Sequence, residues 1–171
     1  DKEASDADLV RVGKTIRALS KKYGAIFIVD DRIPVAKKTG ADGVHLGQRD
    51  ATVKEAHRKL GKGKIVGKST HSLKQALAAA KEKPDYISVG PLYRTPTKPD
   101  YEPVGLSTLK AVKKAFAGHR MAIPIVAIGG ITYSNMAKAF RAGADSIAVV
   151  REVSQAENVE EKVMHLRGKA R

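Results

Sequence analysis

The chain has 171 residues, no cysteine, 42 % hydrophobic residues and a formal net charge of +14. This length is enough for one domain with its own core, and the lack of cysteine excludes disulfides and thiolate metal sites. No apolar run approaches the roughly 20 residues of a membrane span, and the charged first residues do not resemble a signal peptide. We therefore expect a cytoplasmic protein with no membrane partner.

The positive charge allows two interpretations. Nucleic-acid-binding surfaces combine clustered basic residues with aromatic residues that stack on bases. Aromatic residues make up only 5 % of this chain, and its lysines are spread over several predicted helices. We therefore favour a lysine-rich solvated surface and an anionic small-molecule substrate, and we predict no nucleic-acid partner. The sequence specifies no oligomeric state.

Helical and strand patterns alternate along the whole chain. A helix is predicted over residues 6–23, where apolar residues recur at helical spacing and Gly24 ends the pattern. Short apolar runs typical of strands then occupy residues 25–31, 43–47, 64–69, 86–90, 124–130 and 146–150. Helices are predicted over residues 33–40, 51–61, 72–83, 106–118, 134–143 and 158–171. Because continuous apolar strands suit a parallel sheet covered on both faces, we expect a single α/β domain over residues 1–171.

Polar and glycine residues gather at the carboxyl ends of the predicted strands. They comprise Asp30, Asp31, Gln48, Asp50, Ser69, His71, the long 90–105 loop, Gly129, Gly130 and Arg151, which follows Val150 at the end of the last strand. The opposite ends carry plain Gly-Ala-Asp turns at 40–42 and 143–145. Since parallel α/β folds place their chemistry at the carboxyl ends of strands, we expect the 90–105 loop to form one wall of a site.

Most of these positions also have a purely structural interpretation. Asp31 would pair with Arg32, Asp50 would cap the helix that begins at residue 51, and Gly129-Gly130 would form only a tight turn. His45 lies within a strand, so its side chain faces either the interior or a helix. The occurrence of all these residues on one rim favours a functional role.

The residue types on this rim suggest anion binding. Backbone N–H groups at Gly129-Gly130 can cradle a phosphate, and Lys98 with Thr95 and Thr97 supplies a cation and hydroxyl donors. Asp31 and Asp50 offer the hard oxygen ligands that Mg²⁺ takes together with substrate phosphate oxygens. We predict a magnesium site for a diphosphate and a separate monophosphate pocket.

The chain resembles the thiamine-phosphate synthase family. The likeness runs through "VDDR" (29–32), "GADGVHLGQRD" (40–50), "STHS" (69–72), "VGPLYRTPTKPDYEPVGL" (89–106) and the segment 126–150. The resemblance implies a (β/α)8 TIM barrel and a transferase. Such enzymes join a hydroxymethylpyrimidine diphosphate to a thiazole phosphate, release diphosphate and form thiamine monophosphate with the help of Mg²⁺.

The resemblance also implies a role for each matching residue. Asp31 and Asp50 would bind the metal, and Ser69 and Lys98 would contact the diphosphate as the catalytic residues, with Asp30 adjacent. The thiazole phosphate would be held by Thr95 and Thr97 together with the backbone at Gly130 and Val150. His45 and Gln48 would lie near the pyrimidine.

Three features depart from the family pattern. Asp30 stands where the family has Asn, and Arg151 stands where the phosphate-binding turn usually has Ser. The family's first two strands are absent from residues 1–171, so we expect an N-terminally incomplete barrel, exposed edges at 25–30 and 146–150, and weak catalysis. The alternatives are the related thiazole tautomerase, against which "TPTK" (95–98) argues, and a basic nucleic-acid-binding protein.

Overall fold

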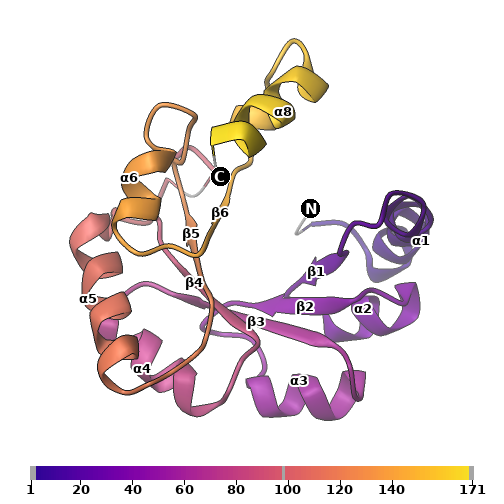
Figure 1. Cartoon of the computed structure of the whole chain (residues 1–171). Helices are drawn as coiled ribbons and strands as arrows, with labels where there is room; N and C mark the ends of the chain where they lie inside the picture. The colour runs from indigo at the N-terminus through magenta and orange to yellow at the C-terminus, as the bar shows by residue number, and fades with distance from the viewer. Residues whose placement is uncertain (1–2, 98, 170–171) are drawn as a thin grey trace. The chain divides into compact units, whose positions relative to one another are not determined.

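The computed structural model describes residues 3–97 and 99–169. Its strands are β1 (Ile28–Asp30), β2 (Gly43–Leu46), β3 (Ile65–Thr70), β4 (Tyr86–Val89), β5 (Ile125–Ile128) and β6 (Ser146–Ala148) (Figure 1). The helices are α1 (Asp6–Tyr23), α2 (Ile33–Thr39), α3 (Val53–Leu60), α4 (Leu73–Lys81), α5 (Gly105–Gly118), α6 (Met136–Arg141), α7 (Arg151–Ser154) and α8 (Val159–Lys169). The predicted alternation of strands and helices is confirmed.

The expectation of an eight-stranded TIM barrel is wrong for this chain. The described residues form a six-stranded sheet whose strands follow one another in chain order. A closed barrel needs its first and last strands to pair, but β1 and β6 end the strand order here. Every residue of β1 and β6 is partly or fully exposed, whereas β2 and β4 are mostly buried. The physical reason is that only six segments of the sequence carry strand patterns.

The chain divides into two compact units. The first unit comprises residues up to Lys68 together with Glu82–Asp85, and the second comprises Ser69–Lys81 and the residues from Tyr86 onward. Each unit has its own hydrophobic cluster, one built on α2, α3 and β2, the other on α4, α5, α6, β4 and β5. That residues 1–171 form a single domain stays a prediction.

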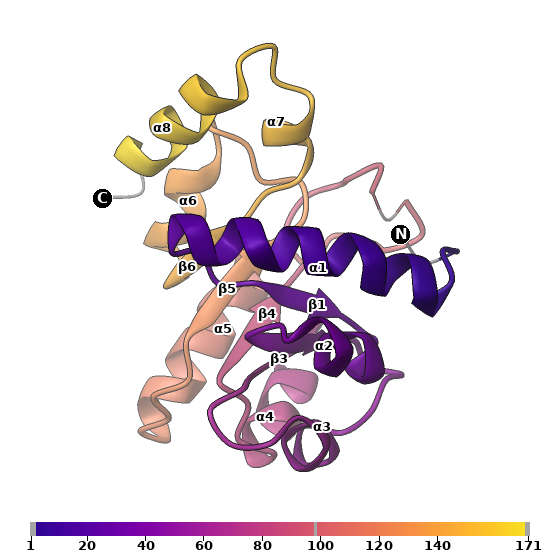
Figure 2. The same ribbon diagram turned by 90° about the vertical axis from the view of Figure 1, so that its right-hand side faces the viewer.

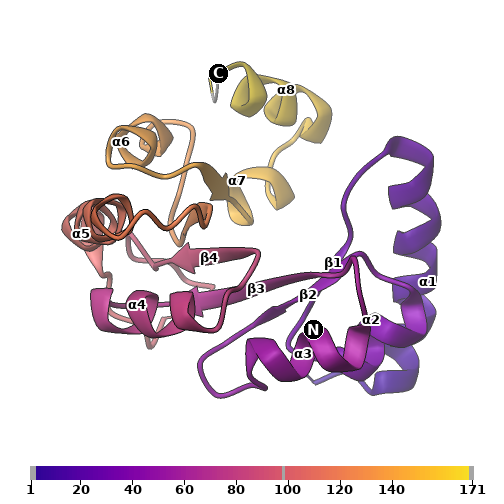
Figure 3. The ribbon, with the colours of Figure 1, turned by 60° about the horizontal axis from the view of Figure 1, so that its bottom comes forward.

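In the first unit, β1, β2 and the first part of β3 pair in parallel, with Asp30 opposite His45 and Leu46 opposite Lys68. α1 packs against α2 (Figure 2). Figure 3 shows α2 and α3 side by side along β2. Gly13 makes the α1–α2 contact possible, because a Cβ there would come within 2.5 Å of the Thr39 methyl group. α2 also contacts β1 and β2, the two strands that precede the predicted metal ligands.

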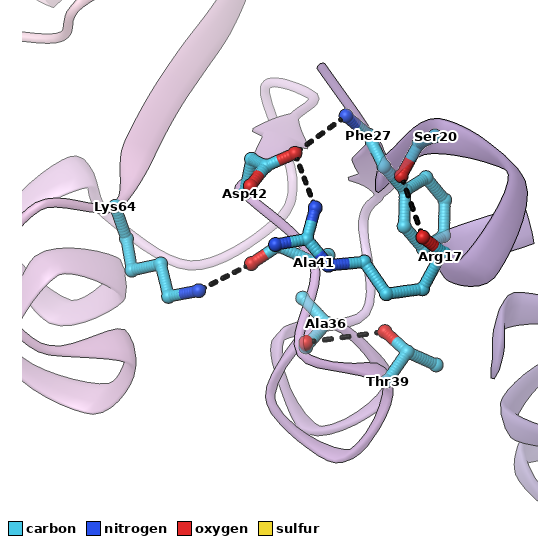
Figure 4. Close-up of polar contacts among 8 residues, drawn as sticks. All are labelled: Arg17, Ser20, Phe27, Ala36, Thr39, Ala41, Asp42 and Lys64. Atoms are coloured by element: carbon cyan, nitrogen blue, oxygen red, sulfur yellow. Dashed lines mark hydrogen bonds and ion pairs between the residues drawn. The ribbon is translucent and has the colours of Figure 1, made fainter. Parts of the chain in front are cut away.

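Asp42 joins β1 to β2 at the amino ends of the strands (Figure 4). Its backbone N–H donates to the Phe27 carbonyl at 2.8 Å, and its carboxylate accepts the Phe27 N–H at 2.9 Å and the Arg17 guanidinium at 2.7 Å. The hydrogen bond from Phe27 and the charge of Arg17 outweigh partial burial and hold the pKa of Asp42 below its usual value. The Gly-Ala-Asp turn at 40–42 is therefore a structural link between strands.

The same link recurs at two further aspartates. Asp85 exchanges two hydrogen bonds with Val66, at 2.9 and 2.7 Å, and Asp145 exchanges two with Ile125, both at 2.9 Å. Lys113 pairs with Asp145 at 2.7 Å, as Arg17 does with Asp42. These bonds explain the repeated Gly-Ala-Asp turns, and they leave the carboxyl ends of the strands as the place for function.

In the second unit, β4, β5 and β6 pair in parallel. Helices α4, α5 and α6 lie along one side of β4 and β5, at the left of Figure 1. Gly90 and Gly129 are needed where the segment after β4 crosses the end of β5. A Cβ at Gly90 would lie 2.2 Å from the Ile128 carbonyl oxygen, and one at Gly129 would lie 2.3 Å from the Pro91 side chain. The close crossing brings the start of the 90–105 loop onto the end of β5.

Candidate active site

In the first unit, the end of β1 presents two consecutive carboxylates. Asp31 has φ of 64°, a left-handed backbone that few residues other than glycine, aspartate and asparagine adopt readily. Its N–H donates to the His45 carbonyl at 2.8 Å, which ties this turn to β2. Arg32, the partner considered for Asp31, donates to the carboxylate of Asp6 at 2.8 Å and to the carbonyl of Ala4 at 2.9 Å. The turn after β1 thus holds Asp30 and Asp31 in a defined backbone conformation.

The end of β2 presents the turn 47–50. The Asp50 carboxylate accepts the Gly47 N–H at 2.6 Å, and both Gln48 and Asp50 are exposed. The N-cap of α3 is Thr52, whose hydroxyl accepts the Glu55 N–H at 3.2 Å. The interpretation of Asp50 as the cap of this helix is therefore wrong, because the helix starts two residues later than predicted.

The predicted metal ligands Asp31 and Asp50 follow neighbouring strands of the same unit. Within residues 3–97 and 99–169, no group of three or more histidine, aspartate or glutamate side chains is arranged to hold a metal ion. Mg²⁺ usually takes only one or two protein carboxylates and completes its shell with water and substrate oxygens. The donor chemistry of the two aspartates therefore fits Mg²⁺ in the presence of a diphosphate.

The second unit contains a cavity of about 350 Å³ at the carboxyl ends of its strands. The predicted residues that line it are Ser69, Thr95, Thr97, Gly130, Val150 and Arg151. This is the size of a small-molecule site. The structure therefore brings together the predicted phosphate-binding residues of this unit. Lys98 lies outside the described residues.

One wall of the cavity is the start of the 90–105 loop, as predicted. The Leu92 N–H donates to the Ile128 carbonyl at 2.8 Å, and the Tyr93 N–H donates to the Gly129 carbonyl at 3.1 Å. Gly130 has φ of 64°, and a Cβ there would lie 2.7 Å from the Arg94 carbonyl oxygen. These contacts hold the loop against the glycine turn, so the hydroxyls of the loop and the backbone of the turn face one cavity.

The opposite side of the cavity is formed by the end of β6 and the short helix α7. The Arg151 Nε donates to the Gln155 side chain at 3.1 Å. The Glu152 carboxylate accepts the Tyr133 N–H at 3.2 Å and pairs with Lys162 at 3.4 Å. Glu152 thereby ties α7 to the turn after β5, and this keeps Val150 and Arg151 at the rim.

Several lining residues were missed by sequence reasoning as site residues. They are Ser88, Arg94, Thr132, Glu152 and Gln155. Ser88 lies inside β4, where nothing in an apolar run marks it, although its hydroxyl is 3.4 Å from that of Ser69. His71, one of the residues expected on the rim, also lines the cavity. Its Nδ1 lies 2.5 Å from the Gly90 carbonyl oxygen, and its ring is tilted by 48° to the ring of Tyr101, with the two centroids 5.0 Å apart.

The family model for thiamine monophosphate synthase matches residues 1–153. The chain belongs to this family. The thiamine-phosphate synthase of Chloroflexus aurantiacus is 43 % identical over 168 residues, which are 98 % of this chain and 75 % of that protein. The thiamine-phosphate synthase of Pyrococcus abyssi is 40 % identical, over 97 % of this chain and 77 % of its own length.

A solved structure supports the same membership in the thiamine monophosphate synthase family. The thiamine phosphate pyrophosphorylase from Pyrococcus furiosus superposes with a TM-score of 0.88 at 36 % identity, over 99 % of this chain and 79 % of its own. The resemblance identified from the motifs is confirmed, and with it the assignment as an enzyme of the transferase class. No helix among the described residues has the length and apolar character needed to cross a bilayer.

Proposed function

We propose that this chain carries out thiamine-phosphate synthesis, in which a thiazole phosphate displaces diphosphate from hydroxymethylpyrimidine diphosphate. The observation that carries the proposal is the cavity of the second unit, whose lining contains the family-motif residues Ser69, Thr95, Thr97 and Gly130. Family membership over residues 1–153 supplies the reaction. We also propose small phosphorylated molecules as its partners and the cytoplasm as its location.

The thiazole phosphate binds in this cavity. The Thr95 and Thr97 hydroxyls, the backbone of Gly130 and Val150, and the Arg151 guanidinium surround its phosphate. Arginine forms charge-assisted, bidentate hydrogen bonds to phosphate, so Arg151 in place of serine strengthens the anion site. Anchoring the phosphate positions the thiazole nitrogen for attack, which is catalysis by orientation.

For the pyrimidine diphosphate, we propose the residues that the family resemblance assigns to it. Asp31 and Asp50 would hold Mg²⁺, which when bound stabilises the negative charge that develops on the departing diphosphate. The Gly47 N–H engages one oxygen of the Asp50 carboxylate and orients the group. Ser69 donates to the diphosphate and Lys98 neutralises its charge, while His45 and Gln48 contact the pyrimidine. No side-chain nucleophile is required.

Asp30 adds a carboxylate next to the diphosphate. The negative charge of Asp30 would repel the negatively charged diphosphate unless a cation compensates for it. We propose that the metal and Lys98 provide this compensation, and that the substrate is bound less tightly than it would be beside asparagine.

The function is tested by incubating the protein with both phosphorylated substrates and measuring thiamine monophosphate. We expect product only when both substrates and Mg²⁺ are present, and none after chelation with EDTA. Absence of product under all conditions would contradict the proposed function.

The role of Arg151 is tested with Arg151→Ala. We expect the KM for the thiazole phosphate to rise roughly 10- to 100-fold, the effect of losing a charged hydrogen bond, with little change in the KM for the pyrimidine diphosphate. Arg11→Ala is the matched control, because Arg11 is exposed on α1, pairs with Asp8 and does not line the cavity. An unchanged KM in Arg151→Ala would remove Arg151 from the phosphate site.

A further inference from the structure

Lys68 on β3 is a buried lysine that the proposed chemistry does not use. Only 6 % of its surface is exposed, and its ammonium group donates to the Gly47 carbonyl at 2.9 Å and to the Ala51 carbonyl at 3.3 Å. Burying a charge is costly unless its hydrogen-bonding groups are satisfied. A hydrophobic residue could be buried here at a lower free-energy cost. The ammonium group therefore indicates that the segment to which it donates hydrogen bonds needs them.

The segment held by Lys68 is the connection between β2 and α3. Lys68 lies opposite Leu46, the last residue of β2, and its side chain reaches past the strand end to both sides of the turn. The turn is also closed by the bond from the Gly47 N–H to the Asp50 carboxylate. Gln48 and Asp50, two residues of the proposed diphosphate and pyrimidine site, are therefore displayed on a turn whose two ends share one ammonium donor.

Lys64 provides an internal comparison. It immediately precedes β3, and its ammonium donates to the Ala41 carbonyl at 2.5 Å (Figure 4). Lys64, just before β3, and Lys68, within it, thus each donate an ammonium hydrogen bond to a connection at one end of β2. Only the connection bound by Lys68 carries proposed site residues.

We propose that Lys68 is a positioning residue that fixes the 47–51 turn, so that Asp50 and Gln48 are set for the magnesium–diphosphate substrate. The inference rests on the proposed function for the identity of the ligand. It assigns Lys68 no contact with the substrate. We expect Lys68 to affect substrate affinity and metal dependence. When the turn is already ordered before binding, no part of the binding free energy is lost in ordering it.

The test compares Lys68→Met with Lys64→Met. Methionine keeps the apolar stem and removes the ammonium in both variants. Binding of hydroxymethylpyrimidine diphosphate is measured by calorimetry at a series of Mg²⁺ concentrations, and amide exchange at Gly47 is followed by NMR. We expect Lys68→Met to weaken binding about tenfold, to raise the Mg²⁺ concentration needed for half-saturation, and to speed exchange at Gly47. Lys64→Met should change none of these.

Lys68→Arg is the second variant and keeps N–H donors at the site. It should bind the substrate more tightly than Lys68→Met and protect the Gly47 amide better, and it remains informative if Lys68→Met does not fold. Equal binding in the parent and in Lys68→Met, or equal losses in Lys68→Met and Lys64→Met, would overturn the proposal. Weakened binding in Lys68→Met with no thiamine monophosphate from the parent would overturn the proposed function and leave the positioning role standing.

Discussion

Asp42 shows how one side chain stabilises the end of the sheet that carries no catalytic group. Its carboxylate accepts hydrogen bonds from the Phe27 backbone and the Arg17 guanidinium, and its backbone N–H returns a bond to Phe27. Both partners of the carboxylate favour its ionised form, which is why the pKa of Asp42 lies below its usual value. The free energy of unfolding is therefore linked to pH through this residue.

The sign of this linkage gives a prediction for Asp42→Asn. The pKa of Asp42 is lower in the folded state than the value near 3.9 of an unfolded chain. Its stabilising effect is complete above that unfolded pKa, and it is lost as pH falls through the folded pKa. We expect Asp42→Asn to lower the free energy of unfolding at pH 7 by about 0.5–1.5 kcal/mol and to flatten its decline below about pH 4.

Urea unfolding of both proteins between pH 3 and 7 checks this expectation. Asp100→Asn serves as the control, because Asp100 is exposed and has no recorded ion pair among the described residues. Parallel pH profiles for Asp42→Asn and the parent would show that the link between β1 and β2 does not depend on the charge of Asp42.

At the scale of elements, the start of α3 assigns different tasks to Asp50 and Thr52, which lie two residues apart in the sequence. Thr52 caps the helix through the Glu55 N–H, whereas Asp50 closes the preceding turn through the Gly47 N–H. A capping hydroxyl contributes about 1 kcal/mol to stability. The carboxylate of Asp50, on the exposed turn, is the proposed metal ligand.

Thr52→Ala should therefore affect stability, whereas Asp50→Ala should affect magnesium dependence. We expect Thr52→Ala to lower the free energy of unfolding by about 1 kcal/mol, with its magnesium dependence unchanged. Asp50→Ala should raise the Mg²⁺ concentration required for half-maximal synthesis roughly tenfold or more. Urea unfolding measures the stability of each variant, and a magnesium titration of product formation measures its metal requirement. An unaltered titration in Asp50→Ala would leave Asp50 with a purely structural task.

Most elements could be predicted from the sequence because their signals are local. α1 spans the predicted residues 6–23, and Gly24 and Gly40 end α1 and α2 with φ near 65°. The four-residue helix α7 is too short to show any periodicity, so no helix was predicted between the strand at 146–150 and the helix at 158–171. The barrel was wrong because closure depends on strand number and pairing between distant segments.

The site was predictable to a similar degree. Thr95 and Arg151 were expected on one rim because parallel strands bring their carboxyl ends to one edge. Both line the cavity, and their roles there stay predictions. Ser88 and Glu152 were missed because they become lining residues only through tertiary packing. Lys68 was missed for the same reason, since neither its burial nor its carbonyl partners can be read from "VGKST" (66–70).

At the scale of the whole molecule, the net charge of +14 is the feature that first suggested nucleic acid. The described ion pairs include Lys59 with Glu55, Lys113 with Asp145 and Arg94 with Glu102, which come from different elements. Such pairs carry no net charge, so it is the surplus of 32 basic over 18 acidic residues that attracts anions. Salt screens this attraction beyond about 8 Å at physiological ionic strength. The surplus raises the local concentration of phosphorylated substrates without specifying a sequence of bases.

A gel-retardation assay tests this view. We expect duplex DNA to be retarded only at low salt and to migrate freely at about 150 mM salt, because contacts to phosphates alone weaken steeply as counterions are added. Retardation that persists at that concentration would support a nucleic-acid-binding function.

The left-handed backbone of Asp31 restricts the evolutionary paths open to this position. With φ of 64°, the turn after β1 accepts glycine, asparagine or aspartate with little conformational penalty, whereas branched and most other side chains would be disfavoured. Exchange between aspartate and asparagine alters the charge while preserving the loop. Natural variants are therefore expected to retune metal affinity here in discrete steps, by alternating between an anionic and a neutral oxygen donor.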